Sequence, residues 1–204
     1  MVADVQRMAI PELTRIFGQC GLYLRPTSAI SPELSGNMVG HVISLHREGQ
    51  RLGGPVRCLD HELPLTSSSL SLVYGLFVLE SSGEPELLMQ EVARVLTPEG
   101  TALLIGFNPW GPARWRWRLR GAHAGAHGQV DRLAQDAGLE VVRHQFLGAV
   151  WPRETTDPAD AGRKRGFDRL RVADLAVLRR REAALTPLRK LGHTVGLRPN
   201  MSTG

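Results

Sequence analysis

Residues 70–107 constrain the fold more than any other part of this 204-residue chain. Leu70 to Leu79 is a nearly continuous apolar run, as expected of a strand that is buried on both faces of a sheet. Pro85 to Leu96 predicts an amphipathic helix with a proline in its first turn, and Thr101 to Phe107 predicts a second buried strand. A strand, a helix and a strand in this order indicate a right-handed crossover between parallel strands.

The rest of the chain continues the alternation of strands and helices. We expect helices at Ala9–Phe17, ended by Gly18 and Gly21, and at Gly128–Ala137. We expect strands at Gly21–Arg25, Val39–His46, Val56–Asp60, Leu139–Phe146 and Leu175–Arg181, with a loop at Thr27–Asn37 and a turn at Gly49–Pro55. The pattern predicts a doubly wound, mostly parallel α/β sheet, with the last two strands paired as an antiparallel edge.

Length and composition favour one domain in a reducing compartment. We expect residues 1–190 to form a single domain and residues 191–204 a loosely ordered tail. No run of about 18 apolar residues occurs, which excludes a membrane-spanning helix, and the first residues lack the pattern of a signal peptide. Cys20 and Cys58 are too few for a disulfide framework, so we read them as reduced thiols in a cytoplasmic protein.

Four motifs in a fixed order give a family resemblance. They read Asp60-His-Glu-Leu-Pro-Leu65, Ser69-Leu-Ser-Leu-Val-Tyr-Gly-Leu-Phe-Val-Leu-Glu80, Glu91-Val-Ala-Arg-Val-Leu-Thr-Pro-Glu-Gly100 and Leu103-Leu-Ile-Gly-Phe-Asn-Pro-Trp110. The series resembles the type 11 branch of class I S-adenosylmethionine-dependent methyltransferases. Its Gly-Phe-Asn-Pro-Trp ending is similar to a bacterial subgroup of small methyltransferase-like proteins.

The resemblance implies a Rossmann-like methyltransferase fold, S-adenosylmethionine as cofactor and an unknown methyl acceptor. It implies no catalytic residue, because the family shares a cofactor site and no common catalytic group. Asp60 with His61 would hold the adenine ring, and Leu63 would pack on its face. The remaining implied cofactor contacts are Leu24, Arg25 and Thr27 in the first loop and Tyr74, Gly75 and Phe77 at the end of the fourth strand.

Two departures from the family put cofactor binding in question while leaving the fold prediction intact. The glycine-rich turn after the first strand is replaced by Leu24-Arg-Pro-Thr-Ser28, in which a proline removes an amide donor. No acid ends the second strand, and Glu48 is the nearest candidate for the ribose hydroxyls. In addition, Phe77 stands where many relatives carry a histidine. The alternative hypothesis is a catalytically inactive scaffold that binds a protein or nucleic-acid partner.

Asn108 and Trp110 are the candidate substrate-binding residues, since the turn that carries them follows the fifth strand near the expected substrate entrance. A purely structural turn is the simpler interpretation. Glu80 is either a base near the methyl acceptor or a structural acid before the helix, and the resemblance favours the second role. No metal site is expected, because His123 and His127 stand among glycines and lack an evident third ligand.

The second half of the chain is basic. Residues 1–109 contain seven basic and 11 acidic residues, a net charge of −4, whereas residues 110–204 contain 18 basic and nine acidic residues, a net charge of +9. Arginines alternate with Trp115 and Trp117 between Arg114 and Arg120, a pattern that suits nucleic-acid binding, an anionic membrane surface or a helix whose tryptophans are docked. Docking is the favoured interpretation, and a protein or nucleic-acid partner at Arg114–Arg120 is the alternative.

Overall fold

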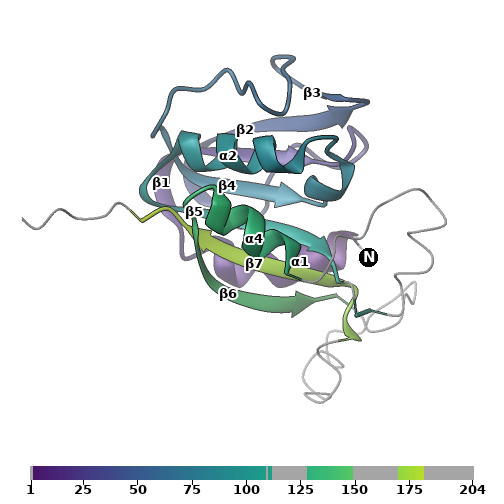
Figure 1. Ribbon diagram of the computed structural model, residues 1–204. Coiled ribbons are helices and arrows are strands. Elements are labelled where there is room, and N and C mark those ends of the chain that lie inside the picture. The colour runs from purple at the N-terminus through teal and green to yellow at the C-terminus, as the bar shows by residue number, and fades with distance from the viewer. Residues whose placement is uncertain (1, 109, 112–127, 149–169, 182–204) are drawn as a thin grey trace, which may run out of the picture.

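The computed structural model describes residues 2–108, 110–111, 128–148 and 170–181, and its strands form one sheet in the order β3-β2-β1-β4-β5-β7-β6 (Figure 1). The strands are β1 (Phe17–Arg25), β2 (Met38–Glu48), β3 (Arg51–Gly53), β4 (Leu70–Leu76), β5 (Leu96–Phe107), β6 (Glu140–Leu147) and β7 (Ala173–Arg179). The helices are α1 (Val2–Leu13), α2 (Pro85–Val95), α4 (Gln129–Asp136) and a short 3-10 helix, η1 (Leu79–Ser81).

The sheet confirms the mostly parallel α/β prediction. β1 pairs in parallel with β2 and β4, and β4 pairs in parallel with β5. β7 is antiparallel to both β5 and β6, as expected for the last two strands. β7 itself lies one position inside the sheet and β6 forms the edge, while the short β3 forms an antiparallel edge at the other side.

Helices cover both faces of the sheet (Figure 1). α2 and α4 pack on one face through an apolar cluster that includes Leu24, Val73, Leu88 and Leu133. α1 packs on the other face through Val5, Ala9 and Leu13, which recur every four residues and so share one side of the helix. That second cluster also contains the buried tyrosines Tyr23 and Tyr74.

The first predicted helix was placed too late in the sequence. The helix ends at Leu13, and Phe17 and both glycines expected to stop the helix lie in β1. Gly18 is required there by a neighbouring strand, because a Cβ at this position would lie 2.1 Å from Ser71 Oγ. The prediction failed because Pro11 was assigned to the first turn, whereas it stands near the end of the helix.

The strand predicted at Val56–Asp60 was also wrong. The chain turns at Gly49, whose φ of +63° favours glycine, and returns as β3 against β2. Val56–Asp60 keeps a single bridge, between Cys58 and Leu52 of β3. The short strand β3, joined to β2 by the two-residue turn at Gly49 and Gln50, therefore forms this edge of the sheet.

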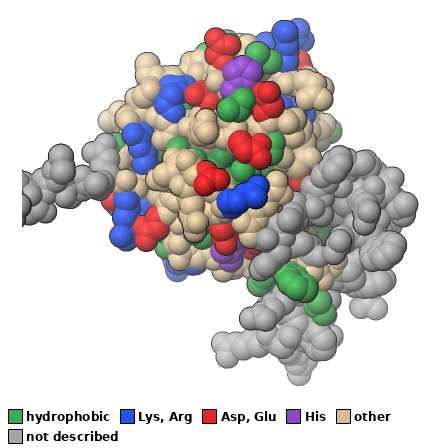
Figure 2. All heavy atoms as spheres, in the orientation of Figure 1, with side chains coloured by type: hydrophobic (Ala, Val, Ile, Leu, Met, Phe, Trp, Pro, Cys, Tyr) green, Lys and Arg blue, Asp and Glu red, His purple; other side chains and the backbone are tan. Residues whose placement is uncertain are grey.

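Several predictions fall outside the described residues: the partner segment Arg114–Arg120, the histidines 123 and 127, and the tail 191–204. The single domain at 1–190 therefore stays a prediction. Where the chain is described, no helix is long and apolar enough to cross a membrane. On the face shown in Figure 2, acidic and basic side chains are interspersed around α2 and α4.

Candidate functional site

The predicted cofactor residues lie at the carboxyl ends of the central strands. From β1 the chain proceeds to β2 and β3 on one side, whereas from β4 it proceeds to β5 on the other, so the strand order reverses between β1 and β4. The two strands are neighbours, with Leu24 paired to Gly75. In open α/β sheets, ligands bind in the crevice beyond the carboxyl ends at such a switch point.

An arginine organises the loop after β1. Arg25 is buried, and its Nη1 donates a hydrogen bond to the carbonyl of Ile30. Its guanidinium carbon lies 5.9 Å from the ring centroid of Tyr23, while its Nε has no hydrogen-bond partner among the described residues. Thr27 is exposed, and its Oγ1 accepts a hydrogen bond of 3.3 Å from the amide of Ala29. This loop is therefore shaped by side-chain hydrogen bonds and not by a glycine turn.

Asp60 is buried and takes part in an ion pair. Arg47 Nη1 lies 2.5 Å from Asp60 Oδ1, and both side chains are almost fully enclosed. Ser82 Oγ donates to Asp60 Oδ2, also at 2.5 Å. Arg47 has two further nitrogens, Nε and Nη2, that are buried without a hydrogen-bond partner in the described chain. The expectation that no acid ends this strand was wrong, because β2 extends to Glu48. The Glu48 carboxylate pairs with His46 and Arg57, whereas the buried charge at this end of β2 is that of Arg47.

The two residues that accompany Asp60 differ in exposure. His61 is exposed, with Nδ1 3.0 Å from Glu84 Oε2. Leu63 is buried in the cluster under α2, and its amide donates to Glu91 Oε2 at 2.9 Å. The loop after Asp60 is therefore bonded to the residue that precedes α2, through His61, and to α2 itself, through Leu63.

Tyr74 lies on the opposite face of the sheet from Asp60. Its ring meets that of Tyr23 edge to face, with centroids 5.3 Å apart, in the cluster under α1. Arg47 shares a face with Leu45, which belongs to the cluster under α2, so its partner Asp60 lies on that side. The sheet thus separates the side chains of these two predicted residues.

A cavity of about 310 Å³ reaches Tyr74 from beneath α1. Its lining includes Gln6 and Ile10 of α1 and Leu34 and Ser35 of the loop after β1. The Tyr74 hydroxyl is buried and has no hydrogen-bond partner in the described chain. Burial raises the pKa of Tyr74 well above its ordinary value, so this phenol stays protonated.

The carboxyl end of β4 contains a strained residue. Phe77 has a φ of +50°, a left-handed conformation that is uncommon for residues with a side chain. Its amide donates to the carbonyl of Ile105 at 2.7 Å, and its ring stacks on Phe107 with centroids 4.4 Å apart. Just before it, Gly75 has no room for a side chain, because a Cβ would lie 2.8 Å from Leu104 Cδ2.

Glu80 follows at the same edge and carries a perturbed carboxyl group. Its Oε1 accepts a hydrogen bond of 2.6 Å from the Phe107 amide, whereas Oε2 is buried without a partner among the described residues. Gly106 permits this approach, since a Cβ there would lie 2.6 Å from Oε1. Burial raises the pKa of Glu80 to about 7, against the effect of the Phe107 hydrogen bond. The contact agrees with the structural role that the resemblance implied.

Asn108 fixes the turn after β5. Its Nδ2 donates to the carbonyl of Arg171 at 2.7 Å, and its Oδ1 accepts from the amide of Trp110 at 3.0 Å. The backbone amide of Asn108 donates to the carbonyl of Val172 at 3.1 Å. Asn108 is buried, whereas Trp110 is 61% exposed. The turn therefore joins β5 to the segment before β7 and presents an aromatic ring at the surface.

Sequence comparison decides the family of this part of the chain. Residues 20–104, from β1 to near the end of β5, match the model of the type 11 methyltransferase domain. This segment belongs to the methyltransferase domain family. Together with the fold, this match supports a methyltransferase-like protein. Among curated proteins, none matches the sequence.

Solved structures share the fold of this methyltransferase-like protein. One is from the complex between the Haloferax volcanii Trm112 methyltransferase activator and a candidate methyltransferase, 13% identical, with a TM-score of 0.59 over 88% of this chain and 90% of the other. A candidate methyltransferase from Bacillus halodurans is 13% identical, with a TM-score of 0.55 over 86% and 98%. Haemonchus contortus phosphoethanolamine N-methyltransferase 2, in complex with phosphomonomethylethanolamine and S-adenosylhomocysteine, is 13% identical, with a TM-score of 0.54 over 87% and 53%.

The sequence did not reveal two contacts at this edge of the sheet, the ion pair of Arg47 and the enclosure of Glu80. Arg47 and Asp60 are 13 positions apart in the sequence, so no local pattern predicts that they form an ion pair. The family resemblance implied an acid at the end of β2 and gave no reason to consider an arginine there. The enclosure of Glu80 depends on the end of β5, 27 residues later. For both Arg47 and Glu80, the sequence offered one indication of a special role, a charged residue beside an apolar strand.

Proposed function

We propose that the chain transfers a methyl group from S-adenosylmethionine to an acceptor, with the cofactor bound across the carboxyl ends of β1, β2 and β4. The observation that carries the proposal is the switch point itself, where Leu24 lies beside Gly75 in a segment that matches the methyltransferase domain family. The structural neighbour with bound S-adenosylhomocysteine supports this choice of cofactor.

Unpaired donors at this edge fit such a ligand. Arg25 Nε and Arg47 Nε and Nη2 are buried N–H groups without partners in the described residues, and an unsatisfied buried donor costs about 1–3 kcal/mol. The cofactor offers acceptors for them in its carboxylate, its ribose oxygens and its adenine nitrogens. Arginine donors would therefore replace the backbone amides that a glycine turn supplies.

The remaining residues would divide the cofactor between them. Asp60 retains lone pairs beyond those used by Arg47 and Ser82, so it can accept a hydrogen bond from the adenine amine. The backbone amide of His61 would donate a hydrogen bond to the same edge of the adenine. Leu63 would pack on the ring. Tyr74, Gly75 and Phe77 would adjoin the methionine part, and Asn108 and Trp110 the acceptor.

The chain contributes alignment to this reaction. When bound, the cofactor supplies a methyl group activated by its sulfonium. The absence of a Cβ at Gly75 leaves room for Leu104 and Val78 to pack against the end of β4. The stacked rings of Phe77 and Phe107 form an apolar surface at the neighbouring strand end. Positioning of this kind supplies much of the acceleration in a displacement reaction.

Isothermal titration with S-adenosylhomocysteine tests the proposal. We expect saturable binding by the wild-type protein. Arg47→Lys keeps the charge beside Asp60 but removes the planar donor fork, so it should weaken binding about tenfold, a loss of about 1.4 kcal/mol. Arg179→Gln, at the opposite end of the sheet, is the matched control and should bind like the wild type. A flat titration of folded wild-type protein at millimolar ligand would contradict the proposal.

A further inference from the structure

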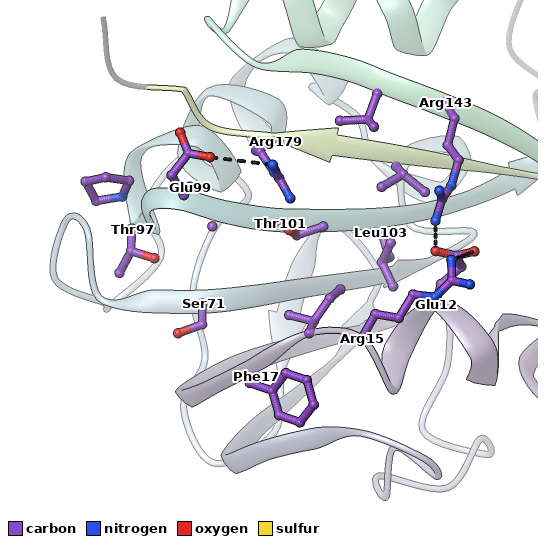
Figure 3. Close-up of a pocket in the computed structure, with 15 residues that line it drawn as sticks. Glu12, Arg15, Phe17, Ser71, Thr97, Glu99, Thr101, Leu103, Arg143 and Arg179 are labelled. Atoms are coloured by element: carbon purple, nitrogen blue, oxygen red, sulfur yellow. Dashed lines mark hydrogen bonds and ion pairs between the residues drawn. The ribbon is translucent and has the colours of Figure 1, made fainter. Parts of the chain in front are cut away.

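A second and larger cavity lies at the amino ends of the central strands, on the face that carries α1 (Figure 3). Its volume is about 560 Å³, within the range of small-molecule sites. It contains none of the predicted cofactor residues, which stand at the other end of the same strands. Its lining includes Arg15, Phe17, Ser71, Thr101, Leu103, Arg143, Val177 and Arg179.

Strand register explains how the cavity is built. Leu103 of β5 pairs with Val177 of β7, which pairs in turn with Arg143 of β6, so the three side chains form one row across the sheet. Thr101 and Arg179 form the next row towards the amino end of β5. The sheet thus supplies an apolar floor and two arginines that rise from it.

A bulge in β6 aims one of these arginines. Val141 pairs with Leu178 and Arg143 with Val177, so Val142 is an extra residue on the β6 side. Val141 packs towards α2 and α4, yet both Val142 and Arg143 line the cavity on the other face. Without the extra residue, alternation would turn Arg143 away. Bulges commonly re-aim a side chain beside a functional site.

A loop in β5 forms the opposite rim. Leu70 pairs with Leu96 and Leu72 with Thr101, which leaves residues 97–100 outside the regular pairing. Glu99 within this loop has a φ of +61°, a left-handed conformation that is uncommon for residues with a side chain. Hydrogen bonds hold it there, from the Glu99 amide to the Arg180 carbonyl at 2.8 Å and from the Arg180 amide to the Gly100 carbonyl at 3.0 Å.

The charges of the cavity do not balance. Glu12 faces both Arg15, at 3.4 Å, and Arg143, and Glu99 faces Arg179 at 3.6 Å. Three guanidinium groups therefore meet two carboxylates, an excess of one positive charge. Each guanidinium has five N–H donors, and these ion pairs engage one nitrogen of each. The cavity can accordingly offer charged donors to an anion.

We propose that this cavity binds a small amphipathic oxyanion at a site separate from the cofactor edge. The oxyanion head, a carboxylate or a phosphate monoester, accepts hydrogen bonds from Arg143 and Arg179, which present forked donors suited to both groups. Its apolar body covers Leu103 and Val177. The ring of Phe17, 67% exposed at the cavity, packs on the same body.

Amide chemical shifts test the proposal with three small probes of similar shape: phenyl phosphate, phenylacetate and the neutral 2-phenylethanol. We expect saturable shifts at the amides of Phe17, Ser71 and Thr101 with at least one of the two anions. The anion that binds more tightly identifies the head group as phosphate or carboxylate. The alcohol should bind at least about tenfold more weakly, because it lacks the charge that the arginines recognise.

Arginine variants test whether Arg143 and Arg179 bind the anion. Arg179→Gln and Arg143→Gln should each weaken the anion about fivefold or more, and their affinity loss should shrink as salt rises. Arg181→Gln is the control, since Arg181 lies two residues beyond Arg179 and pairs with Glu140 outside the cavity lining. Absence of saturable shifts, equal binding of the alcohol, or equal affinity of both cavity variants and the wild type would overturn the proposal. S-adenosylhomocysteine binding is a separate readout, so failure here is distinguishable from failure of the proposed function.

Discussion

Glu80 is a carboxylate that the fold removes from water. It follows β4 directly, and its Oε2 is enclosed between the ends of two strands without a hydrogen-bond donor among the described residues. Burial raises its pKa to about 7 from an ordinary value of 4.5. The folded protein therefore holds a proton on this group that the unfolded chain releases between these two values, and the folded state loses stability as pH rises through that window.

Glu80→Gln should abolish this loss. The neutral amide keeps an acceptor for the Phe107 amide but has no charge to bury. The free energy of unfolding of the variant, relative to the wild type, should rise between pH 5 and pH 8 by up to about 3 kcal/mol, the value of two and a half pKa units. Urea unfolding at both pH values measures it. Glu86→Gln removes an exposed charge from α2 and serves as the control. A constant difference between Glu80→Gln and the wild type across this range would show that the carboxylate is not buried in solution.

Single residues at the site were partly predictable. Asp60 and Gly75 could be selected because a motif surrounds each, and their roles as cofactor contacts stay predictions. The role of Arg47 could not be predicted, because it depends on an ion pair with Asp60, a buried acid from another segment of the chain. Likewise, nothing in the sequence marks Phe77 as left-handed, since that conformation is imposed by hydrogen bonding to β5.

At the scale of helices and strands, His144 of β6 forms ion pairs with residues of β7 and α4. Its Nδ1 lies 2.9 Å from Asp174 of β7 and its Nε2 2.7 Å from Asp131 of α4, while the residue itself belongs to β6. The hydrogen bond with Asp174 raises the pKa of His144 to about 9, with a further contribution from Asp131 and against the effect of burial. The edge of the sheet is thus fastened to a helix by a charged imidazole.

His144→Gln should weaken the protein only where that charge is present. The raised pKa contributes stability that is complete below about pH 6.5 and is lost as pH rises through about 9. We expect the variant to be about 1 kcal/mol less stable at pH 6, after screening by solvent, and close to the wild type at pH 10. Thermal or urea unfolding at the two pH values measures this, with the exposed His41→Gln as control. A deficit that persists unchanged at pH 10 would indicate lost packing and not lost charge.

Helices and strands were predictable where the sequence carries a clear local pattern. The helix α2 was placed within one residue, because a proline at its start and an apolar face both mark it. β4, β5 and β7 were found through their apolar runs. The hairpin of β2 and β3 was missed, since three residues make too short a pattern to distinguish a strand from a turn. The helix α1 was misplaced, because a proline is compatible with the first turn and was taken to mark it.

For the molecule as a whole, the two ends of the sheet carry different sets of candidate functional residues. The carboxyl edge holds the predicted cofactor residues and two buried arginines with unpaired donors. The amino edge holds the cavity of Arg143 and Arg179. The same strands, β4 and β5, run between the two edges, and both faces of these strands are packed. This packing consists of two apolar clusters, one on each face.

The two clusters should melt together. They share the strands β1, β4, β5 and β7, whose successive side chains alternate between them, so disrupting one face also removes the support of the other. Leu88→Ala, fully buried under α2, should cost about 3 kcal/mol. Its effect should extend to Tyr23 and Tyr74, which lie in the cluster on the opposite face and contribute to near-ultraviolet circular dichroism.

Near-ultraviolet and far-ultraviolet dichroism of Leu88→Ala, followed through urea unfolding, measure this coupling. Coincident transitions at a lower urea midpoint than the wild type are expected of a single cooperative domain. Leu87→Ala, the same change at the neighbouring but 36% exposed position, should cost under about 1 kcal/mol and supplies the control. A tyrosine signal that survives after the far-ultraviolet signal has fallen would mean that the face under α1 is stable by itself. In that case the two edges of the sheet could not be mechanically linked through β4 and β5.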